Sequence, residues 1–349
     1  MHRLYSAVIG LAVGLFASSA FPQTTAKYFS PVNESSPAGQ AFAVFRAQVE
    51  KSTSGKVRFL SLPSAPATVL LKGLQDGLAD IGMVSTLSLG QLDAGYQVFE
   101  LPFLFGDVGA VGRFLNGAGG VVLKKRLRER GLEPLAVIDE GMSVGFTKKP
   151  IRSLGDLEGL KFATLTAEPR TASMLTAVNA SVTRAAVRDV ENMVTAGLVD
   201  GYFGPATVFS SKLQIPGLSI IPTRHAYIGF VLLASTKFID GLPRDLRTAV
   251  ANGAVAAEAE GKKQALDRLA SLEARWRQAG IRVAPLPSAE ISKWRTSAKP
   301  SWIAFDKSVG SDLLNLAISS TGGGGDPCPT LSECRCSDRT CSTQCCSKK

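Results

Sequence analysis

The stretch that decides the fold runs from Pro150 to Pro205 and reads PIRSLGDLEGLKFATLTAEPRTASMLTAVNASVTRAAVRDVENMVTAGLVDGYFGP. Gly159 ends a short acidic helical turn and precedes an apolar strand over 160–164, and Gly197 ends a helix and precedes a strand over 198–203. A strand that follows a helix ended by glycine is typical of an α/β unit with a parallel sheet. The stretch therefore predicts the α/β fold class.

The carboxyl ends of these two strands are the first candidates for a ligand site, because open α/β sheets bind ligands there. One strand ends in Ala163 and Thr164, and the other ends in Tyr202 and Phe203. The two aromatic rings can form an apolar wall against a ligand, and the alternative for both is packing in the core.

Helical and strand-like segments alternate along most of the chain, which supports the same fold class. The order β-α-β-α-β over 26–84 indicates one doubly wound half, and a second half begins at Pro150. Further expected segments are an apolar loop over 99–105 that plugs the core, strands over 135–139 and 144–147, a returning strand over 228–234, a long helix over 243–280 along both halves, and helices over 288–294 and 301–316.

The composition is that of a sizeable globular protein. The chain has 349 residues, 45% of them hydrophobic, which is enough for one large or two medium domains. The net charge is +10, but the bases are dispersed, and the 7% of aromatic residues do not alternate with them as a nucleic-acid stacking surface requires. We therefore expect no nucleic-acid partner, whereas a positive field can steer anionic ligands.

The N-terminus has the pattern of an export signal over residues 1–20. His2 and Arg3 precede an apolar run over 7–16, and a small-residue cleavage site follows at 18–20. The apolar run is too short for a membrane-spanning helix, and no cysteine follows it as a lipid anchor would require. We expect a soluble protein exported to the periplasm.

The C-terminal part, over 319–349, is expected to be a glycine linker followed by a cysteine-rich tail. All six cysteines of the chain lie there: Cys328, Cys334, Cys336, Cys341, Cys345 and Cys346. So short a tail cannot build a core, so disulfides or a bound metal would be needed to order it. Disulfides, soft-metal binding, a disordered appendage and a non-native reading frame all stay open, because six cysteines allow 15 pairings.

Several short motifs, in order, resemble those of the solute-binding proteins of TRAP (tripartite ATP-independent periplasmic) transporters, C4-dicarboxylate type. The resemblance covers roughly residues 26–300, and the order and spacing of the motifs make it specific. The motifs are Gly55 to Val57, Leu74 to Ile81, Leu101 to Phe105 (LPFLF), Asp156 to Lys161 (DLEGLK), Gly197 to Gly201 (GLVDG), His225 to Tyr227, and Phe238 to Pro243.

The resemblance implies a two-lobed periplasmic-binding-protein fold with crossing strands and a long helix that spans both lobes. The first lobe would comprise 21–141 and 235–270, and the second 142–234 and 271–318. The implied function is an extracytoplasmic receptor, which closes on one small organic ligand and delivers it to TRAP membrane permease subunits. We expect a monomer with no cofactor and no metal.

The family's carboxylate clamp is missing from this sequence. In the family, the strand after the GLK motif carries an arginine that binds the ligand carboxylate through two parallel hydrogen bonds, and here Ala163 stands at that position. Lys161 points to the other side of the strand and cannot replace the arginine. Tyr202 and Phe203 stand where the family often has polar residues. We therefore expect a more apolar pocket and a ligand other than a simple dicarboxylate.

Other residues could replace the clamp. Thr164 can donate a hydrogen bond, Arg170 begins the next helix, and Ser143 lies where the family often has a base. The alternative for each is a surface or lobe contact. The further candidates are Arg184, Glu140 and Asn33.

His225 precedes the returning strand, and we expect it either to contact the ligand or to be a structural hydrogen-bonding group. It is the single histidine beyond the export signal, which argues against a metal site or a Ser-His pair. The alternatives to a TRAP receptor are a periplasmic enzyme on the same scaffold and a receptor for a sensor or another transporter.

Overall fold

The computed structural model describes residues 23–30, 32, 34, 36–208, 215 and 217–321, and for residues 266–270 it describes the backbone alone. The expected export signal, the cysteines of the tail and the candidate Asn33 lie outside the described residues.

The strands are β1 (Thr24–Phe29), β2 (Val57–Ser61), β3 (Ile81–Ser85), β4 (Leu132–Thr147), β5 (Lys161–Leu165), β6 (Ser181–Ala185), β7 (Gly201–Pro205), β8 (Ser219–Ile221), β9 (Tyr227–Ser235) and β10 (Arg282–Val283). The helices are α1 (Pro37–Ser52), α2 (Ala67–Asp76), α3 (Thr86–Leu92), α4 (Val108–Asn116), α5 (Ala118–Arg128), α6 (Pro169–Thr176), α7 (Val187–Thr195), α8 (Thr236–Gly241), α9 (Arg244–Gln278), α10 (Ser288–Val309) and α11 (Ser311–Ser320). Short 3-10 helices are η1 (Ala94–Glu100), η2 (Leu154–Leu157) and η3 (Ala206–Val208).

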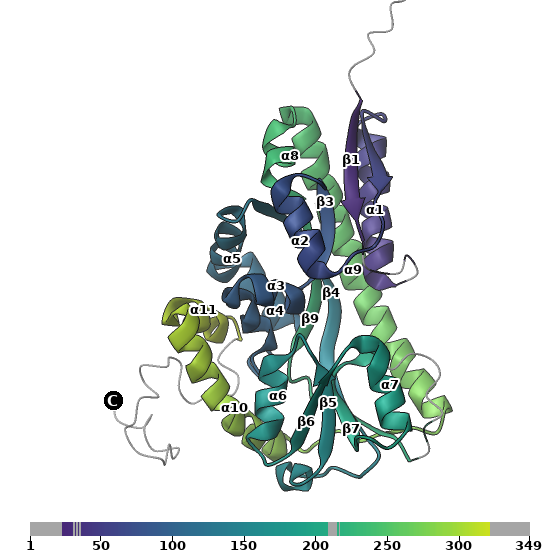
Figure 1. Ribbon diagram of the computed structural model, residues 1–349, viewed down its shortest axis with the longest axis vertical. Coiled ribbons are helices and arrows are strands. Elements are labelled where there is room, and N and C mark those ends of the chain that lie inside the picture. Colours follow the sequence, from purple (N-terminus) through teal and green to yellow (C-terminus); the bar gives the residue numbers. More distant parts are fainter. Residues whose placement is uncertain are drawn as a thin grey trace, which may run out of the picture.

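The strands form a mixed sheet in the order β2-β1-β3-β9-β4-β7-β5-β6, which confirms the predicted α/β class (Figure 1). We use "first lobe" for β1–β3 with α1–α5 and α8, and "second lobe" for β5–β8 and β10 with α6 and α7. Within each lobe the neighbouring strands β1, β2 and β3, or β5, β6 and β7, pair in parallel. β4 and β9 join the lobes and run antiparallel to their neighbours, so the sheet is not wholly parallel.

β4 is one continuous strand, where the sequence predicted separate strands over 135–139 and 144–147. Its first part pairs with β9, and its last residues pair with β7 and β8. The register with β9 shifts between Asp139 and Gly141, and Gly141 has φ 126°, a region that favours glycine. The bulge lets the strand bend where it passes between lobes without losing its pairing, and this explains the difference.

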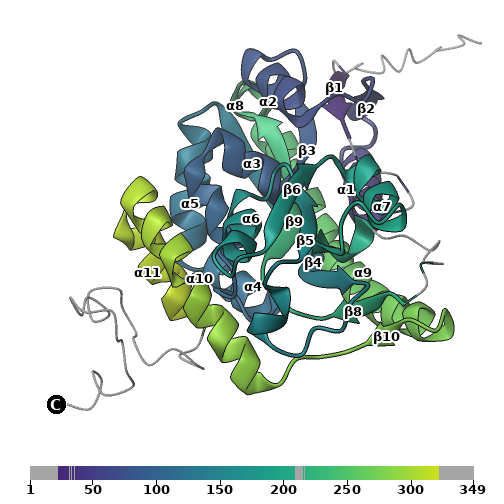
Figure 2. The same ribbon diagram turned by 60° about the horizontal axis from the view of Figure 1, so that its bottom comes forward.

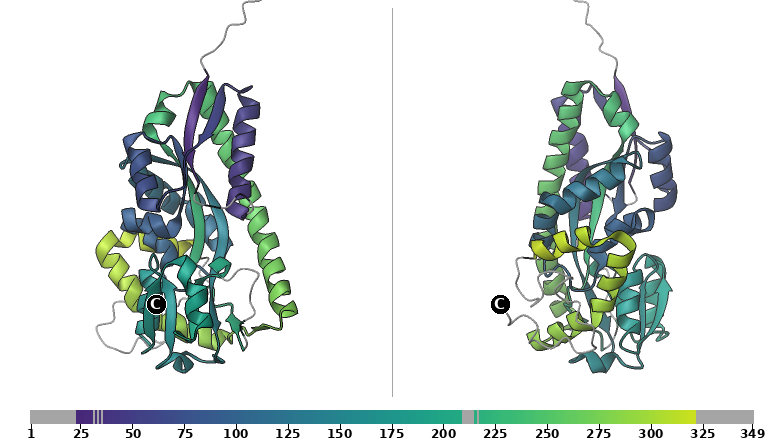
Figure 3. Two further views of the ribbon diagram at one scale, coloured as in Figure 1. Left: turned by 45° about the vertical axis from the view of Figure 1, so that its right-hand side comes forward. Right: turned by 90° about the vertical axis from the view of Figure 1, so that its left-hand side faces the viewer.

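Helix α9 runs along both lobes, as the sequence predicted (Figures 1 and 3). Near its start Leu246 and Val250 belong to a core of the first lobe that also contains α1. Near its end Leu272 and Trp276 belong to a core of the second lobe. Like β4 and β9, this helix connects the two lobes.

The apolar loop over 99–105 plugs the core, as predicted, and it does so in both lobes. Leu104 and Phe105 pack in the first lobe, whereas Phe103 inserts into a second-lobe core. Phe103 has φ 59°, which is unusual for a bulky residue, and its N–H donates to the carbonyl of His225 at 2.7 Å. The ring of Phe103 meets that of Trp294 edge to face, with centroids 6.0 Å apart.

Helix α10 packs against the same plug. It is continuous through Pro300, whereas the sequence predicted separate helices over 288–294 and 301–316. Trp294 and Phe305, on either side of Pro300, are fully buried in cores of different lobes. Burial on both sides of the proline offsets the backbone hydrogen bond that proline cannot make. The Trp302 indole N–H donates to the carbonyl of Pro102 at 3.0 Å and ties α10 to the plug.

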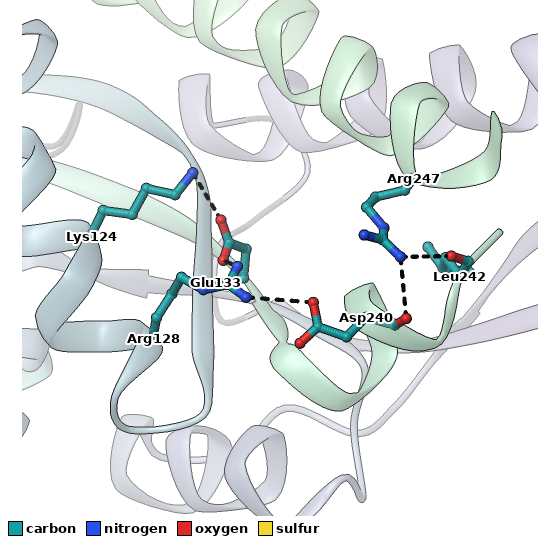
Figure 4. Close-up of polar contacts among 6 residues, drawn as sticks. All are labelled: Lys124, Arg128, Glu133, Asp240, Leu242 and Arg247. Carbon is teal, nitrogen blue, oxygen red and sulfur yellow. Dashed lines mark hydrogen bonds and ion pairs between the residues drawn. The ribbon is translucent and has the colours of Figure 1, made fainter. Parts of the chain in front are cut away.

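A network of ion pairs and hydrogen bonds links the start of β4 to helices α5, α8 and α9 (Figure 4). Glu133, which is buried, pairs with Lys124 at 2.9 Å and with Arg128, both from α5. Arg128 also reaches Asp240 of α8, and Arg247 of α9 donates to the carbonyl of Asp240 at 3.2 Å. A buried carboxylate is tolerated here because two cations and their hydrogen bonds compensate it.

Candidate functional site

The two strand ends that were predicted to form the ligand site, those of β5 and β7, lie side by side in the second lobe. β5 and β7 pair in parallel, and Ala163 stands opposite Tyr202. Both residues, together with Thr164 and Phe203, are fully buried. Alternation along the strands places Ala163 and Tyr202 on one face of the sheet and Thr164 and Phe203 on the other.

The space above Gly204 is filled by Tyr202 and by Glu168, an acid that the sequence did not select. A Cβ atom on Gly204 would lie 2.2 Å from the Tyr202 hydroxyl and 2.7 Å from Glu168 Oε2. Both distances are too short for a real side chain, so glycine is required here. The Tyr202 ring itself stacks on Phe146, with centroids 6.2 Å apart. The neighbours of this end of the sheet are therefore the phenol of Tyr202, which stands opposite Ala163, and the carboxyl group of Glu168.

Glu168 is fully buried in the turn between β5 and α6. Its Oε2 accepts the N–H of Leu165 at 3.2 Å, and its Oε1 has no hydrogen-bond partner among the described residues. The sequence indicated the position of Glu168 at a helix start, because an acid directly before a proline is common where a helix begins.

Glu100 of the first lobe approaches the same helix start. Its Oε1 accepts the backbone N–H of Arg170 at 2.6 Å and that of Thr171 at 3.4 Å. These are first-turn N–H groups of α6, which have no acceptor within the helix, so Glu100 caps a second-lobe helix from the first lobe. The sequence could not indicate this contact, because Glu100 and α6 are far apart along the chain.

Burial sets the protonation of these two carboxyl groups. It raises the pKa of Glu100 to about 8, although the N–H groups of Arg170 and Thr171 act in the opposite direction. Burial and the neighbouring Glu100 raise the pKa of Glu168 well above its ordinary value. Two acids in one dry site cannot both ionise cheaply, so we expect the pair to hold a proton at neutral pH.

Arg170 does not point toward Ala163 as a free clamp. Its Nη2 donates to Gln97 Oε1 at 2.8 Å, its Nη1 donates to the carbonyl of Ser301 at 3.2 Å, and its guanidinium lies over the ring of Phe305. These are contacts with the first lobe and with α10. Arg184 is exposed, and its guanidinium donates to the carbonyl of Thr166.

Phe203 and His225 lie together on the other face of the sheet. The Phe203 ring lies 5.1 Å from Phe162, 5.7 Å from His225 and 6.0 Å from Trp294, measured between centroids. His225 is fully buried, its Nδ1 shares a hydrogen bond with Thr223 Oγ1 at 2.7 Å, and burial lowers its pKa to about 3. The imidazole is therefore neutral and held within the protein.

Several buried polar atoms near the strand ends have no protein partner among the described residues. They are Ser143 Oγ, Thr164 Oγ1, Glu168 Oε1 and Thr171 Oγ1. Buried polar groups are nearly always hydrogen-bonded, so these atoms mark places where a ligand or ordered water supplies the partner. Such groups can orient a polar ligand, and none of them is paired with a base that would activate a nucleophile.

Glu140 lies on the wall of a cavity of about 210 Å³ next to the point where β4 bends, and Pro205 at the end of β7 lines the same cavity. We call it the hinge cavity, and Met142, Ile228, Lys262 and Trp276 are among its lining residues. Sequence reasoning did not find this cavity, because its walls come from segments that are distant along the chain.

Two further features bear on the class of protein. Within the described ranges, no group of three or more His, Cys, Asp or Glu side chains is placed to hold a metal ion. In the same ranges, no helix is both long and apolar enough to cross a membrane.

Comparison with known proteins places these features in context. Residues 29–308 match the model of a family described as bacterial extracellular solute-binding protein, family 7. The chain is 26% identical over 292 residues to the C4-dicarboxylate-binding periplasmic protein DctP of Vibrio cholerae, which covers 81% of this chain and 86% of that protein.

Solved structures have the same fold. A TRAP periplasmic solute-binding protein from Ochrobactrum anthropi superposes with a TM-score of 0.80 at 23% identity, over 86% of this chain and 95% of that one. Another, from Sulfurospirillum deleyianum with bound succinate, has a TM-score of 0.73 at 25% identity, over 86% of this chain and all of that one. Both confirm the two-lobed architecture.

Proposed function

The chain belongs to family 7 of the bacterial extracellular solute-binding proteins, and on that premise we propose that it is a receptor that captures a small organic ligand between its lobes. In this proposal the receptor delivers the ligand to the membrane permease of a TRAP transporter. The observation that carries the proposal is the extent of the family match, because residues 29–308 include both lobes, both crossing strands and both strand ends.

The proposed mechanism is lobe closure about β4, β9 and α9. The bulge at Gly141 gives β4 a place to bend, and α9 contributes side chains to cores of both lobes. Contacts such as that of Glu100 with the start of α6 form only when the lobes are together. A ligand that adds contacts to both lobes therefore favours the closed arrangement.

The proposed ligand carries a carboxylate but is not a simple C4-dicarboxylate. The relative from Vibrio cholerae is named for C4-dicarboxylates, and the structure from Sulfurospirillum deleyianum holds succinate. In this chain Ala163 supplies no cation, and Glu168 lies beside the Tyr202 hydroxyl near Gly204. The second carboxylate of a dicarboxylate would lie near the acid Glu168 there. The hydroxyl groups of a hydroxylated acid would instead find hydrogen-bonding partners in Glu168 and Tyr202.

The proposed ligand contacts are Thr164, Tyr202, Ser143 and Glu168 at the strand ends, and Asn33, which lies outside the described residues. We also propose that the protein acts in the periplasm as a monomer and catalyses no reaction. The burial of His225 supports the absence of catalysis, because an imidazole that is shielded from solvent and has a pKa lowered to about 3 is a weak base.

Calorimetric titration with a panel of organic acids tests the proposal. The panel contains succinate, malate and hydroxylated monocarboxylates such as gluconate. We expect one hydroxylated acid to bind with one-to-one stoichiometry, and Thr164→Val to weaken its binding about threefold to tenfold, since a buried hydrogen bond is lost. Thr176→Val, on the exposed end of α6, is the matched control and should leave the affinity unchanged.

Two results would count against parts of this proposal. Binding of none of these acids would contradict the assignment of a carboxylate ligand. Tight binding of succinate that Arg170→Ala abolishes and Phe203→Ala preserves would show that Arg170 is the replacement clamp and that the ligand is an ordinary dicarboxylate.

A further inference from the structure

The hinge cavity adjoins the strand ends of the proposed ligand site. Pro205, the last residue of β7, lines the cavity and pairs with Ser143 of β4. Ser143 is one of the proposed ligand contacts, and it stands between Met142 and Val144, which both line the cavity. A ligand that reaches Ser143 therefore has the cavity next to it.

Both lobes contribute to the cavity wall. Val108 comes from the first lobe and Ile220 from the second, and the remaining lining comes mainly from β4, β9 and α9. Figure 2 shows the second-lobe strands β8 and β10 beside α9. An occupant of the cavity contacts both lobes, so its binding favours the closed arrangement that the receptor function requires.

The inner part of the cavity is apolar, and its charged groups lie toward solvent. The buried lining residues are Val144, Pro205, Ile220, Ile228, Leu272 and Trp276. The charged lining residues are all exposed or partly exposed, namely Asp107, Asp139, Glu140, Arg224, Lys262 and Glu273. Burial in the inner part stabilises an apolar group. A carboxylate there would lose its hydration, because no cation is buried among the described lining residues.

The alanine that stands in place of the family's arginine borders the same apolar region. Ala163 faces the same side of the sheet as Tyr202. Both belong to a hydrophobic cluster that also contains the lining residues Leu272 and Trp276. An arginine at position 163 would bring a charge to this region. The loss of the clamp and the apolar cavity therefore both favour an apolar group on the ligand.

The volume and one wall of the cavity suit an aromatic ring. A cavity of roughly 150 Å³ lined by apolar residues can hold benzene. At about 210 Å³, the hinge cavity has room for a phenyl ring and a short chain that joins it to the strand ends. Trp276 supplies an aromatic surface for this ring. Its buried indole Nε1 has no hydrogen-bond partner among the described residues and can donate to a polar substituent on the ring.

We propose that the hinge cavity holds the apolar body of the receptor's own ligand, and that this ligand is a hydroxylated monocarboxylate with an aromatic ring. The proposal rests on the receptor function proposed above and names the class of its ligand. The carboxylate and the hydroxyl group stay at the strand ends near Ser143, and the ring packs against Leu272 and Trp276. A sugar acid has no apolar body and would leave the cavity unfilled.

Calorimetric titration of the full chain with 3-phenyllactate and with lactate tests the proposal. The two acids share the carboxylate and the hydroxyl group, and they differ by the ring. We expect phenyllactate to bind one-to-one and at least about tenfold more tightly than lactate, because the ring is removed from water in the cavity.

Variants that fill the cavity locate the ring. Ala265 of α9 and Ala206, which follows β7, both line the cavity and are partly exposed, so either position can accept a larger side chain. Ala265→Leu and Ala206→Leu should each lower the ratio of the phenyllactate affinity to the lactate affinity at least about fivefold. The melting temperature of each variant shows whether it is folded.

Ala259→Leu is the matched control, because Ala259 is exposed on α9 and does not line the cavity. The ratio of the two affinities should be the same as in the parent protein. A fall of this ratio in Ala259→Leu as large as in Ala265→Leu, or an unchanged ratio in both cavity variants, would overturn the placement of the ring.

The titrations also separate this proposal from the receptor function on which it rests. If gluconate binds and phenyllactate binds no more tightly than lactate, the receptor function stands and the aromatic ligand is contradicted. Binding of none of these acids would contradict both proposals.

Discussion

Replacing Phe203 by alanine is expected to lower the free energy of unfolding by about 3–5 kcal/mol, the usual effect of removing a buried phenylalanine. The ring is fully buried, and its centroid lies 5.1–6.0 Å from the ring centroids of Phe162, His225 and Trp294. The cavity left behind could not close easily, because β7 is held between β4 and β5. Unfolding in urea, followed by circular dichroism, measures the loss.

The control for Phe203→Ala is Val187→Ala. Val187 lies at the start of α7, is 57% exposed, and should change the unfolding free energy by less than about 0.5 kcal/mol. This pair of variants decides between the two roles considered for Phe203. A loss below about 1 kcal/mol, combined with loss of ligand binding, would identify the ring as a wall of the binding site instead of core.

Replacing Glu100 by glutamine is expected to stabilise the protein at high pH and to leave its stability near pH 5 almost unchanged. The pKa of Glu100 rises from the ordinary 4.5 to about 8, mainly through burial. Between these two values the folded protein holds a proton that the unfolded chain has lost. The contribution of Glu100 to the free energy of unfolding is therefore fully present below about pH 4.5, and it is lost as the pH rises through 8.

The size of this effect follows from the pKa shift, at about 1.4 kcal/mol for each unit. The decline from pH 4.5 to above pH 8 is therefore on the order of 5 kcal/mol for Glu100, and Glu168 acts in the same direction. Glutamine keeps an acceptor for the N–H groups of Arg170 and Thr171 but never ionises. The melting temperature, measured from pH 5 to pH 9, should fall less in the variant than in the parent.

Glu129→Gln supplies the matched control for the pH series, because Glu129 is an exposed acid at the end of α5. Its pH profile should follow that of the parent protein. If Glu100→Gln also follows the parent profile, Glu100 is already ionised in the folded protein and does not hold a proton between the lobes.

Much of the fold followed from local patterns in the sequence. Gly159 and Gly197 end helical segments, as their positions indicated, and both have positive φ. The strand over 160–164 became β5, shifted by one residue, whereas the strand expected over 198–203 begins at Gly201 because residues 198–200 form the turn. The strand β6 was missed, because its exposed and polar residues give no apolar run.

The site was less predictable than the fold. Strand ends could be selected because they share a known edge of the sheet, and the structure places Ala163 beside Tyr202. Glu100 and Glu168 meet only through folding, and so do the walls of the hinge cavity. Local patterns carry no signal for such contacts. The roles in ligand binding of Thr164, Tyr202, Ser143 and the other candidates stay predictions.

Native mass spectrometry of the full chain, freshly purified from a periplasmic extract, tests the receptor function most directly. A receptor should carry one small organic acid per chain, which is released on denaturation and has the same mass after any length of incubation. A bound molecule that is chemically altered over time would contradict the receptor function in favour of an enzyme, and a protein that retains no organic acid and regains none from the extract would also contradict it.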